Sequence, residues 1–247
     1  MTKTIIVLAI LILAGAEVVF GQTTAASRGF VVINGGFQLT PNDFSDGGTK
    51  RENAEDGRID ADYTVKGGPS FDIAGGGRLW RQLAVGVGVS RFSVATPTTV
   101  TGSVPHPFFF NRLRAVSGGA AGLKREELGV HIQARWVLPV STRLQVMVFG
   151  GPSFFQVKQG VVTDFTYTDS YPYDEAAFRA VTTTDASVSK VGFNGGADVG
   201  YFFTRQVGVG ASLQFAGTSV DLPGAGGSTR EVKVGGAKAG GGLRFRF

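Results

Sequence analysis

An alternating pattern runs through Leu128-Gly129-Val130-His131-Ile132-Gln133-Ala134-Arg135-Trp136-Val137-Leu138. Every even-numbered position in this stretch is apolar, and most of the odd positions between them hold small or polar residues. A period of two is the period of a β-strand with one apolar face and one polar face. The stretch therefore predicts a strand that places His131, Gln133 and Arg135 on the same polar face.

The same alternation recurs along the rest of the chain. Eight strands are predicted, at residues 29–38, 59–77, 82–93, 125–138, 143–157, 187–203, 206–217 and 230–247. The links after the second, fourth and sixth strands are short, whereas the others, at 39–57, 95–126, 158–186 and 218–229, are long and polar. Short turns at one end and long loops at the other are typical of outer-membrane barrels. We expect an all-β fold, an eight-stranded antiparallel up-and-down transmembrane β-barrel.

One predicted strand is irregular. In the eighth strand, Val232 and Val234 are out of phase with Leu243, Phe245 and Phe247. Either a bulge near Gly235-Gly236 or a rise of this end above the membrane would reconcile the two halves.

The N-terminus has the pattern of an export signal. Lys3 precedes an apolar run at residues 5–14, which is too short to span a bilayer but fits a signal-peptide core. Small residues allow cleavage after Ala16 or after Gly21, and we favour Gly21. We therefore expect a signal peptide at 1–21 and an outer-membrane barrel domain at 22–247.

Composition excludes several classes of function. The 247 residues include no cysteine, so no disulfide or thiolate metal site is expected. The net charge of +5 is spread along the chain without a Lys/Arg run, so nucleic acid is not an expected partner. His106 and His131 lack metal-ligand spacing, and no Gly-x-Ser-x-Gly motif occurs. We expect no catalytic residues, no metal and no cofactor.

The direction of the apolar face separates a membrane barrel from two soluble alternatives, a lipocalin-like barrel and a β-sandwich. Both soluble folds bury the apolar face and need bulky side chains there. The opposite face here is rich in glycine, at positions such as Gly86, Gly88 and Gly210, which suits a narrow lumen. We therefore assign the apolar face to lipid and the polar face to the lumen.

The polar positions form the predicted lumen network. Its members are Asp72, Glu127, His131, Gln133, Arg135, Asn194, Asp198, Gln214 and Lys238, with Gln145, Arg244 and Arg246 as further inward positions. Eight strands enclose a space that side chains can fill, and buried charges need partners. We predict a plug of paired charges, with a carboxylate of Asp72 or Asp198 within salt-bridge reach of Arg135.

The chain ends Gly242-Leu243-Arg244-Phe245-Arg246-Phe247, and alternating apolar residues before a terminal Phe resemble the assembly signal of outer-membrane barrels. With the strand layout, the chain resembles the small outer-membrane barrels that include OmpA-type, OmpX-type, OmpW-type and opacity-like proteins. The resemblance implies insertion by the barrel assembly machinery into a membrane of lipids and lipopolysaccharide. Leu243, Phe245 and Phe247 would carry that recognition, unless they are only the last lipid-facing positions.

The long loops are the expected recognition surface. Two clusters of aromatic residues are candidates, namely Phe108, Phe109 and Phe110 in one loop and Tyr167, Tyr171 and Tyr173 in another. The three Phe could pack over the barrel mouth or dip into the outer leaflet. The tyrosine loop could instead be a solvated loop whose base extends the barrel's hairpin, and the loop at 43–60 is expected to be mobile.

We predict a monomeric, non-enzymatic protein with an envelope structural or surface-interaction role, whose surface ligand the sequence does not name. The alternative is a narrow channel with a lateral exit for small molecules, hydrophobic ones included, as in OmpW-like proteins. A lipid-modifying outer-membrane enzyme is the third reading.

Overall fold

The computed structural model describes residues 28–224 and 228–247. The predicted signal peptide at 1–21 lies outside the described residues. Within the described part of the chain, the strands are β1 (Gly29–Gln38), β2 (Phe44–Glu52), β3 (Glu55–Tyr63), β4 (Gly68–Trp80), β5 (Leu83–Ala95), β6 (Thr98–Pro105), β7 (Leu113–Ala120), β8 (Lys124–Pro139), β9 (Leu144–Asp169), β10 (Ala176–Phe202), β11 (Val207–Pro223) and β12 (Thr229–Arg246). In these same residues, no helix has the length and apolar character needed to cross a membrane.

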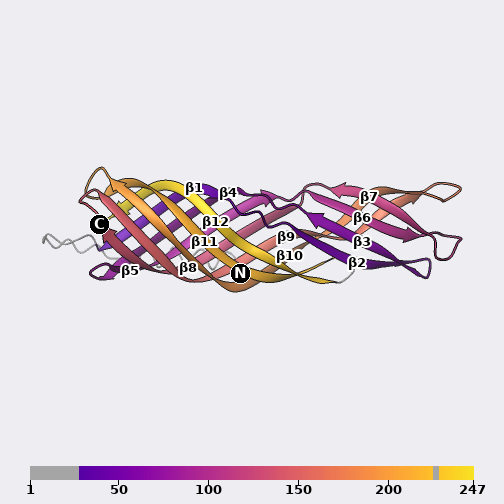
Figure 1. Cartoon of the computed structure of the whole chain (residues 1–247), viewed down its shortest axis with the longest axis horizontal. Helices are drawn as coiled ribbons and strands as arrows, with labels where there is room; N and C mark the ends of the chain where they lie inside the picture. Colours follow the sequence, from indigo (N-terminus) through magenta and orange to yellow (C-terminus); the bar gives the residue numbers. More distant parts are fainter. Residues whose placement is uncertain (1–27, 225–227) are drawn as a thin grey trace.

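Eight of the strands close a barrel in the order β1-β12-β11-β10-β9-β8-β5-β4, and every neighbouring pair is antiparallel. Figure 1 shows these strands crossing the left half of the molecule at a slant. The predicted eight-stranded antiparallel barrel is confirmed, including the short turns after β4, β8 and β10.

The barrel wall is oriented as the alternation predicts. On β8 the side chain of Ile132 is 55% exposed, whereas that of its neighbour His131 is 2% exposed. Val87 on β5 and Val209 on β11 also point outward. A water-soluble barrel would show the reverse arrangement, so the apolar side chains face lipid.

The four long links consist largely of strands, which corrects the prediction of loops except at 158–186, where the expected extension of the barrel's hairpin is present. Residues 39–57 contain β2, residues 95–126 contain β6 and β7, and the other two links extend β9, β10, β11 and β12 beyond the barrel. The predicted strand at 59–77 is two strands, because 59–63 completes β3 and the barrel strand β4 begins at Gly68. The segment 43–60, predicted to be a mobile loop, forms most of the β2–β3 hairpin.

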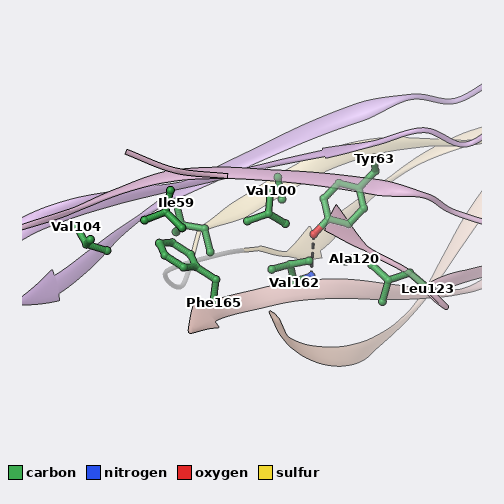
Figure 2. Close-up of a cluster of buried hydrophobic side chains, with 10 residues drawn as sticks. Ile59, Tyr63, Val100, Val104, Ala120, Leu123, Val162 and Phe165 are labelled. Atoms are coloured by element: carbon green, nitrogen blue, oxygen red, sulfur yellow. Dashed lines mark hydrogen bonds between the residues drawn. The ribbon is translucent and has the colours of Figure 1, made fainter. Parts of the chain in front are cut away.

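A second layered unit therefore projects from the barrel. Strands β2, β3, β6 and β7 form a four-stranded sheet in that order, in the right half of Figure 1. This sheet packs on the extended ends of β9 and β10, and the buried side chains between the layers include Ile59, Val100, Val162 and Phe165 (Figure 2). The alternating residues of the links thus bury a core of their own, and this burial explains why they are strands.

A buried hydrogen bond to Tyr63 is among those that join the two layers of this sandwich. The backbone N–H of Val162 donates to the hydroxyl oxygen of Tyr63 over 2.8 Å, drawn as a dashed line in Figure 2. The Tyr63 ring stacks on Phe44, with the ring centroids 4.3 Å apart. Burial raises the pKa of Tyr63 to about 12.

The register of β12 decides against a bulge near Gly235-Gly236 in the predicted eighth strand. β12 pairs with β11 without a register shift through Gly235 and Gly236, so no residue is inserted there. Val232 and Val234 point inward, in the same parity as Lys238. The interior itself changes from polar to apolar along the strand.

Candidate functional site

The barrel interior brings together the predicted lumen residues. His131 lies between two serines: its Nε2 is 2.9 Å from the hydroxyl of Ser90, and its Nδ1 is 2.7 Å from that of Ser153. Lys238 extends toward the same Ser90 hydroxyl, at 3.4 Å. All four side chains are buried, so the ring nitrogens are held by hydroxyls rather than by water.

Asn194 connects this group to the barrel wall. Its amide nitrogen donates to the Ser153 hydroxyl and to the carbonyl oxygen of Gly151, and its carbonyl oxygen accepts from Gln133. The same nitrogen lies 3.3 Å from the carbonyl of Pro152. Pro152 has no N–H to donate to a sheet, and the β8–β9 pairing skips Gly151 and Pro152. The carbonyl oxygens of these two residues accept from Asn194 in the lumen.

A chain of four polar side chains crosses the lumen. Arg244 pairs with Asp198 at 2.5 Å and donates to the Asn34 carbonyl oxygen at 2.6 Å. Asn34 in turn donates to Asp72 at 2.7 Å. These residues come from β12, β10, β1 and β4, so the chain holds opposite walls together.

Arg135 does not have the carboxylate partner that we predicted. Across the described residues, no carboxylate lies within ion-pairing distance of it. Its guanidinium donates to the carbonyl oxygen of Gln133 over 2.6 and 3.1 Å. It also lies over the rings of Phe30 and Phe149, at 4.6 and 5.1 Å from their centroids. The electron-rich faces of these neutral rings take the place of an adjacent carboxylate in stabilising the cation.

The remaining inward positions lie at the centre of the lumen and at its turn end. Gln214 lines the central cavity, and Gln145 lines the cavity at the turn end. Arg246 lies at that same end, where it donates to the carbonyl oxygens of Arg205 and Thr142 and covers the ring of Phe202. Arg246 therefore ties together turns of the barrel rather than joining the central network.

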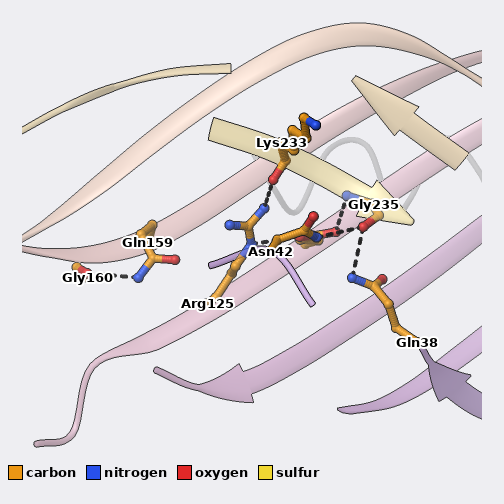
Figure 3. Close-up of polar contacts among 8 residues, drawn as sticks. Gln38, Asn42, Arg125, Gln159, Gly160, Lys233 and Gly235 are labelled. Atoms are coloured by element: carbon orange, nitrogen blue, oxygen red, sulfur yellow. Dashed lines mark hydrogen bonds and ion pairs between the residues drawn. The ribbon is translucent and has the colours of Figure 1, made fainter. Parts of the chain in front are cut away.

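A second polar group closes the junction between barrel and sandwich, shown in Figure 3. Arg125 is fully buried; it pairs with Glu127 at 2.7 Å and donates to the Lys233 carbonyl across the interior. Glu127 accepts from the N–H of Gly235. The carbonyl oxygen of Gly235 accepts from Gln38 and Asn42. The predicted lumen residue Glu127 thus belongs to this junction.

The interior leaves little free space. The central cavity has a volume of about 20 Å³ and the cavity at the turn end about 30 Å³, each about the space of one or two water molecules. Beyond the junction, the interior is apolar, with Phe155, Val220 and Val232 among its buried side chains. The interior therefore holds a polar layer, a charged junction and a dry apolar layer in series.

The aromatic candidates gather at the distal tip, defined here as the turns at residues 51–56, 105–114 and 169–175. Phe108 packs edge-on against Tyr173, with their centroids 5.4 Å apart, and Tyr171 contacts Tyr173 at 6.1 Å. Phe109 lies beside the His106 ring at 4.8 Å. Two sequence regions some 60 residues apart therefore form one aromatic surface.

Ion pairs hold the turns of the distal tip together. Arg112 pairs with Asp174 at 2.8 Å, and the buried Arg114 pairs with Asp169 at 2.6 Å. The N–H of Asn111 donates to Glu55 on the β2–β3 turn. The tip is therefore one tied structure rather than three independent loops.

The predicted positions of the three Phe are wrong. The β6–β7 and β9–β10 turns lie at the right-hand end of Figure 1, opposite the turn end of the barrel. Phe108, Phe109 and Phe110 therefore neither cover the barrel mouth nor reach the protein's own bilayer. Tyr167 lies lower in the sandwich; burial and its hydrogen bond to Glu52 raise its pKa to about 12.

The outer surface of the barrel decides its environment. Its exposed apolar side chains include Phe71, Val87, Ile132, Val199, Leu213 and Leu243, and aromatic residues such as Trp80 and Phe203 lie beside the short turns. A closed barrel with an apolar band outside, aromatic residues at its rim and charges inside belongs in an outer membrane. The chain is an outer-membrane β-barrel protein.

Comparison with known proteins finds barrels of the same kind. No protein-family model matches the chain, and no curated protein matches it in sequence. Among solved structures, it is similar to outer membrane protein OprG from Pseudomonas aeruginosa, at 13% identity and a TM-score of 0.47, over 90% of this chain and 96% of OprG. Neisserial surface protein A is similar at 11% identity and a TM-score of 0.44, over 89% and 97%. The Escherichia coli outer membrane protease OmpT is similar at 8% identity and a TM-score of 0.47, over 92% and 100%.

The C-terminal residues of this barrel protein lie at its closing seam. Leu243 and Phe247 are exposed on the lipid side, and Phe245 is half-buried. The backbone groups of Phe247 and Gly29 exchange two hydrogen bonds, at 2.7 and 3.1 Å.

The lumen residues that the sequence analysis missed also point inward, because they occupy the same alternate positions of their strands as the residues that it found. Asn34 alternates with outward-facing residues on β1, and Arg125 has the same parity as His131 on β8. Ser90 and Ser153 are inward by the same rule. In the described residues, no cluster of three or more His, Asp or Glu side chains could hold a metal ion.

Proposed function

We propose that this outer-membrane β-barrel protein is a non-enzymatic surface-interaction protein. Its filled barrel serves as an anchor, and its sandwich presents the distal tip to another macromolecule outside the cell. The observation that carries the proposal is the exposure of Phe108, Phe110 and Tyr171, at 70%, 77% and 88%, on a tied tip far from the lipid-facing band. Exposed aromatic side chains on a preorganised surface are the usual anchors of protein recognition.

The interior supports an anchor rather than a channel. The chain from Asp198 to Asp72, the Arg125–Glu127 pair and the apolar layer block the axis in succession. The buried position of His131 and its two serines also supports the proposal that the protein is not an enzyme. His131 does contact two serine hydroxyls, but all three side chains are buried in the lumen, where a lipid substrate has no path to them.

The other parts of the proposal concern export, assembly and surroundings, and they follow from this role. Residues 1–21 direct export, the barrel assembly machinery recognises the end of the chain at Leu243, Phe245 and Phe247, and lipids with lipopolysaccharide surround the barrel. The protein acts as a single copy and without a cofactor.

Planar-bilayer recording of the purified protein tests the proposal. We expect no steady ionic current at any applied voltage, because the lumen is filled. A steady current in the wild-type protein would favour the narrow channel instead. Release of fatty acid from phospholipid or lipopolysaccharide by the same preparation would favour a lipid-modifying enzyme.

A further inference from the structure

We propose that the partner of the distal tip is a cationic protein segment, rich in Lys or Arg, which places its cations over the free aromatic faces of the tip. This inference rests on the proposed surface-interaction function and adds the chemical class of the partner.

The rings of this region already bind cations of the chain itself. Arg112 lies over Phe109 at 5.7 Å, Arg114 over Tyr167 at 5.6 Å and Lys50 over Phe165 at 4.9 Å. In the described part of the chain, the rings of Phe108, Phe110 and Tyr171 have no such cation. These three rings are also the most exposed of the tip. An aromatic face attracts a Lys or Arg cation through its quadrupole.

The charge of the distal tip complements such a partner. The whole chain has a net charge of +5, but the three turns of the tip hold six carboxylates and three arginines. Two of those arginines are paired with Asp169 and Asp174. The exposed Asp56 and Glu175 form no ion pair with the residues that the structure describes. The tip that presents the free rings therefore has a negative excess, which disfavours an anionic lipid surface.

The tip is prepared for binding without refolding. Arg114 bonds to Asp169 and to the carbonyl of Pro105, and Nδ1 of the buried His106 accepts hydrogen bonds from the N–H groups of Phe108 and Phe109. A turn that is already ordered loses little conformational entropy when a partner binds.

Binding of defined probes to the full-length protein in nanodiscs tests the proposal. The probes are a nine-residue arginine peptide, the matching lysine and glutamate peptides, and vesicles of phosphatidylcholine with and without phosphatidylglycerol. We expect the arginine and lysine peptides to bind and the glutamate peptide not to bind. The affinity should fall as salt rises, because exposed charges are screened.

Matched variants then assign the binding to the tip. Phe108→Ser/Phe110→Ser should weaken arginine-peptide binding roughly tenfold, as expected from the loss of two exposed cation–π contacts. Phe108→Tyr/Phe110→Tyr keeps the ring faces and should bind like the wild type. Asp56→Asn/Glu175→Gln should weaken binding and flatten its salt dependence. Asp185→Asn, an exposed carboxylate on β10 away from the tip, should change nothing.

Several results would overturn the proposal. Equal binding of the arginine and glutamate peptides would exclude a cationic partner. Wild-type binding by the Ser/Ser variant would exclude the rings as the binding site. Vesicle binding that depends on Phe108 and Phe110 would make a lipid surface the occupant. A steady current through the wild-type barrel would instead overturn the proposed function itself, whatever the peptides do.

Discussion

At the scale of single residues, the hydroxyl of Tyr63 joins the two layers of the sandwich. The Tyr63 side chain is 1% exposed, and its oxygen accepts the Val162 N–H. Tyr63→Phe keeps the ring on Phe44 but leaves that N–H buried without a partner, which costs about 1–3 kcal/mol. We expect faster hydrogen exchange at amides of β3 and the distal half of β9, with the barrel amides unchanged. Tyr171→Phe, at an exposed ring, is the control; equal exchange in both variants would contradict the assigned role.

The pKa values of two tyrosines predict how the stability of the sandwich changes at alkaline pH. The pKa values of Tyr63 and Tyr167 are raised from 10 to about 12, mainly by burial. A folded-state pKa above the unfolded value means that the stabilisation is complete below pH 10 and is lost as the pH rises toward 12. Sandwich stability, followed by protease resistance, should therefore fall across this window. Tyr63→Phe/Tyr167→Phe should show a shallower fall, and an unchanged slope would contradict the prediction.

Parity predicts the face of a residue but not its partner. The alternation placed His131, Gln133 and Arg135 in the lumen because a strand period of two requires it. The partner of Arg135 depends on which strands lie opposite each other in the barrel and on which cation lies closest to each carboxylate. Arg244, on β12, takes Asp198, and Arg135 is left with Gln133 and two rings.

At the scale of elements, the long links form strands that alternation alone does not assign to a sheet. The alternation of Ile59, Ala61 and Tyr63 predicts a strand, but these residues end β3 instead of beginning a barrel strand. The link at 95–126 holds β6 and β7 and not the predicted loop, in keeping with the rarity of long structureless segments in compact domains. Alternation over a few residues does not say which sheet a strand joins. That choice depends on the facing layer, here formed by the distal ends of β9 and β10.

The sandwich core is separate from the lumen, so the two units should respond differently to a cavity. Phe165 is fully buried between the layers. Phe165→Ala should destabilise the sandwich by about 3–5 kcal/mol. We expect new protease cleavage within residues 95–126 but an unchanged heat-modifiable barrel on gel electrophoresis. Phe110→Ala, which removes an exposed ring, should cause neither change; loss of the folded barrel in Phe165→Ala would mean that the units form one core.

The closing seam predicts the effect of shortening the chain. Deletion of Phe247 removes two backbone hydrogen bonds to Gly29 and the ring that lies directly over that glycine. If the terminal Phe also carries assembly recognition, the deletion should reduce the heat-modifiable, membrane-inserted fraction. Phe203→Ala, an exposed aromatic at a different short turn, is the matched control. Wild-type yield from the deletion variant would contradict both roles.

At the scale of the whole molecule, the balance of charge inside the barrel decides whether the lumen stays closed. Arg135, Lys238 and Arg244 are buried in the lumen, and Asp72 and Asp198 lie among them. Glu127, the other lumen carboxylate, is occupied by Arg125. The network that joins opposite walls therefore depends on two carboxylates.

Replacing both carboxylates should expose this dependence. Asp72→Asn/Asp198→Asn keeps the shape of both side chains but leaves three cations without a free counter-charge. Removal of one partner from a buried pair costs about 3–5 kcal/mol, and the remaining cations should draw in water and anions. We expect a lower urea midpoint and a new current whose reversal potential in a salt gradient indicates anion selectivity. Asp221→Asn, which removes an exposed carboxylate outside the lumen, is the control. If the double variant stays silent and as stable as the wild type, then the ring faces and amides suffice to hold the cations, and paired charge is not what closes the barrel.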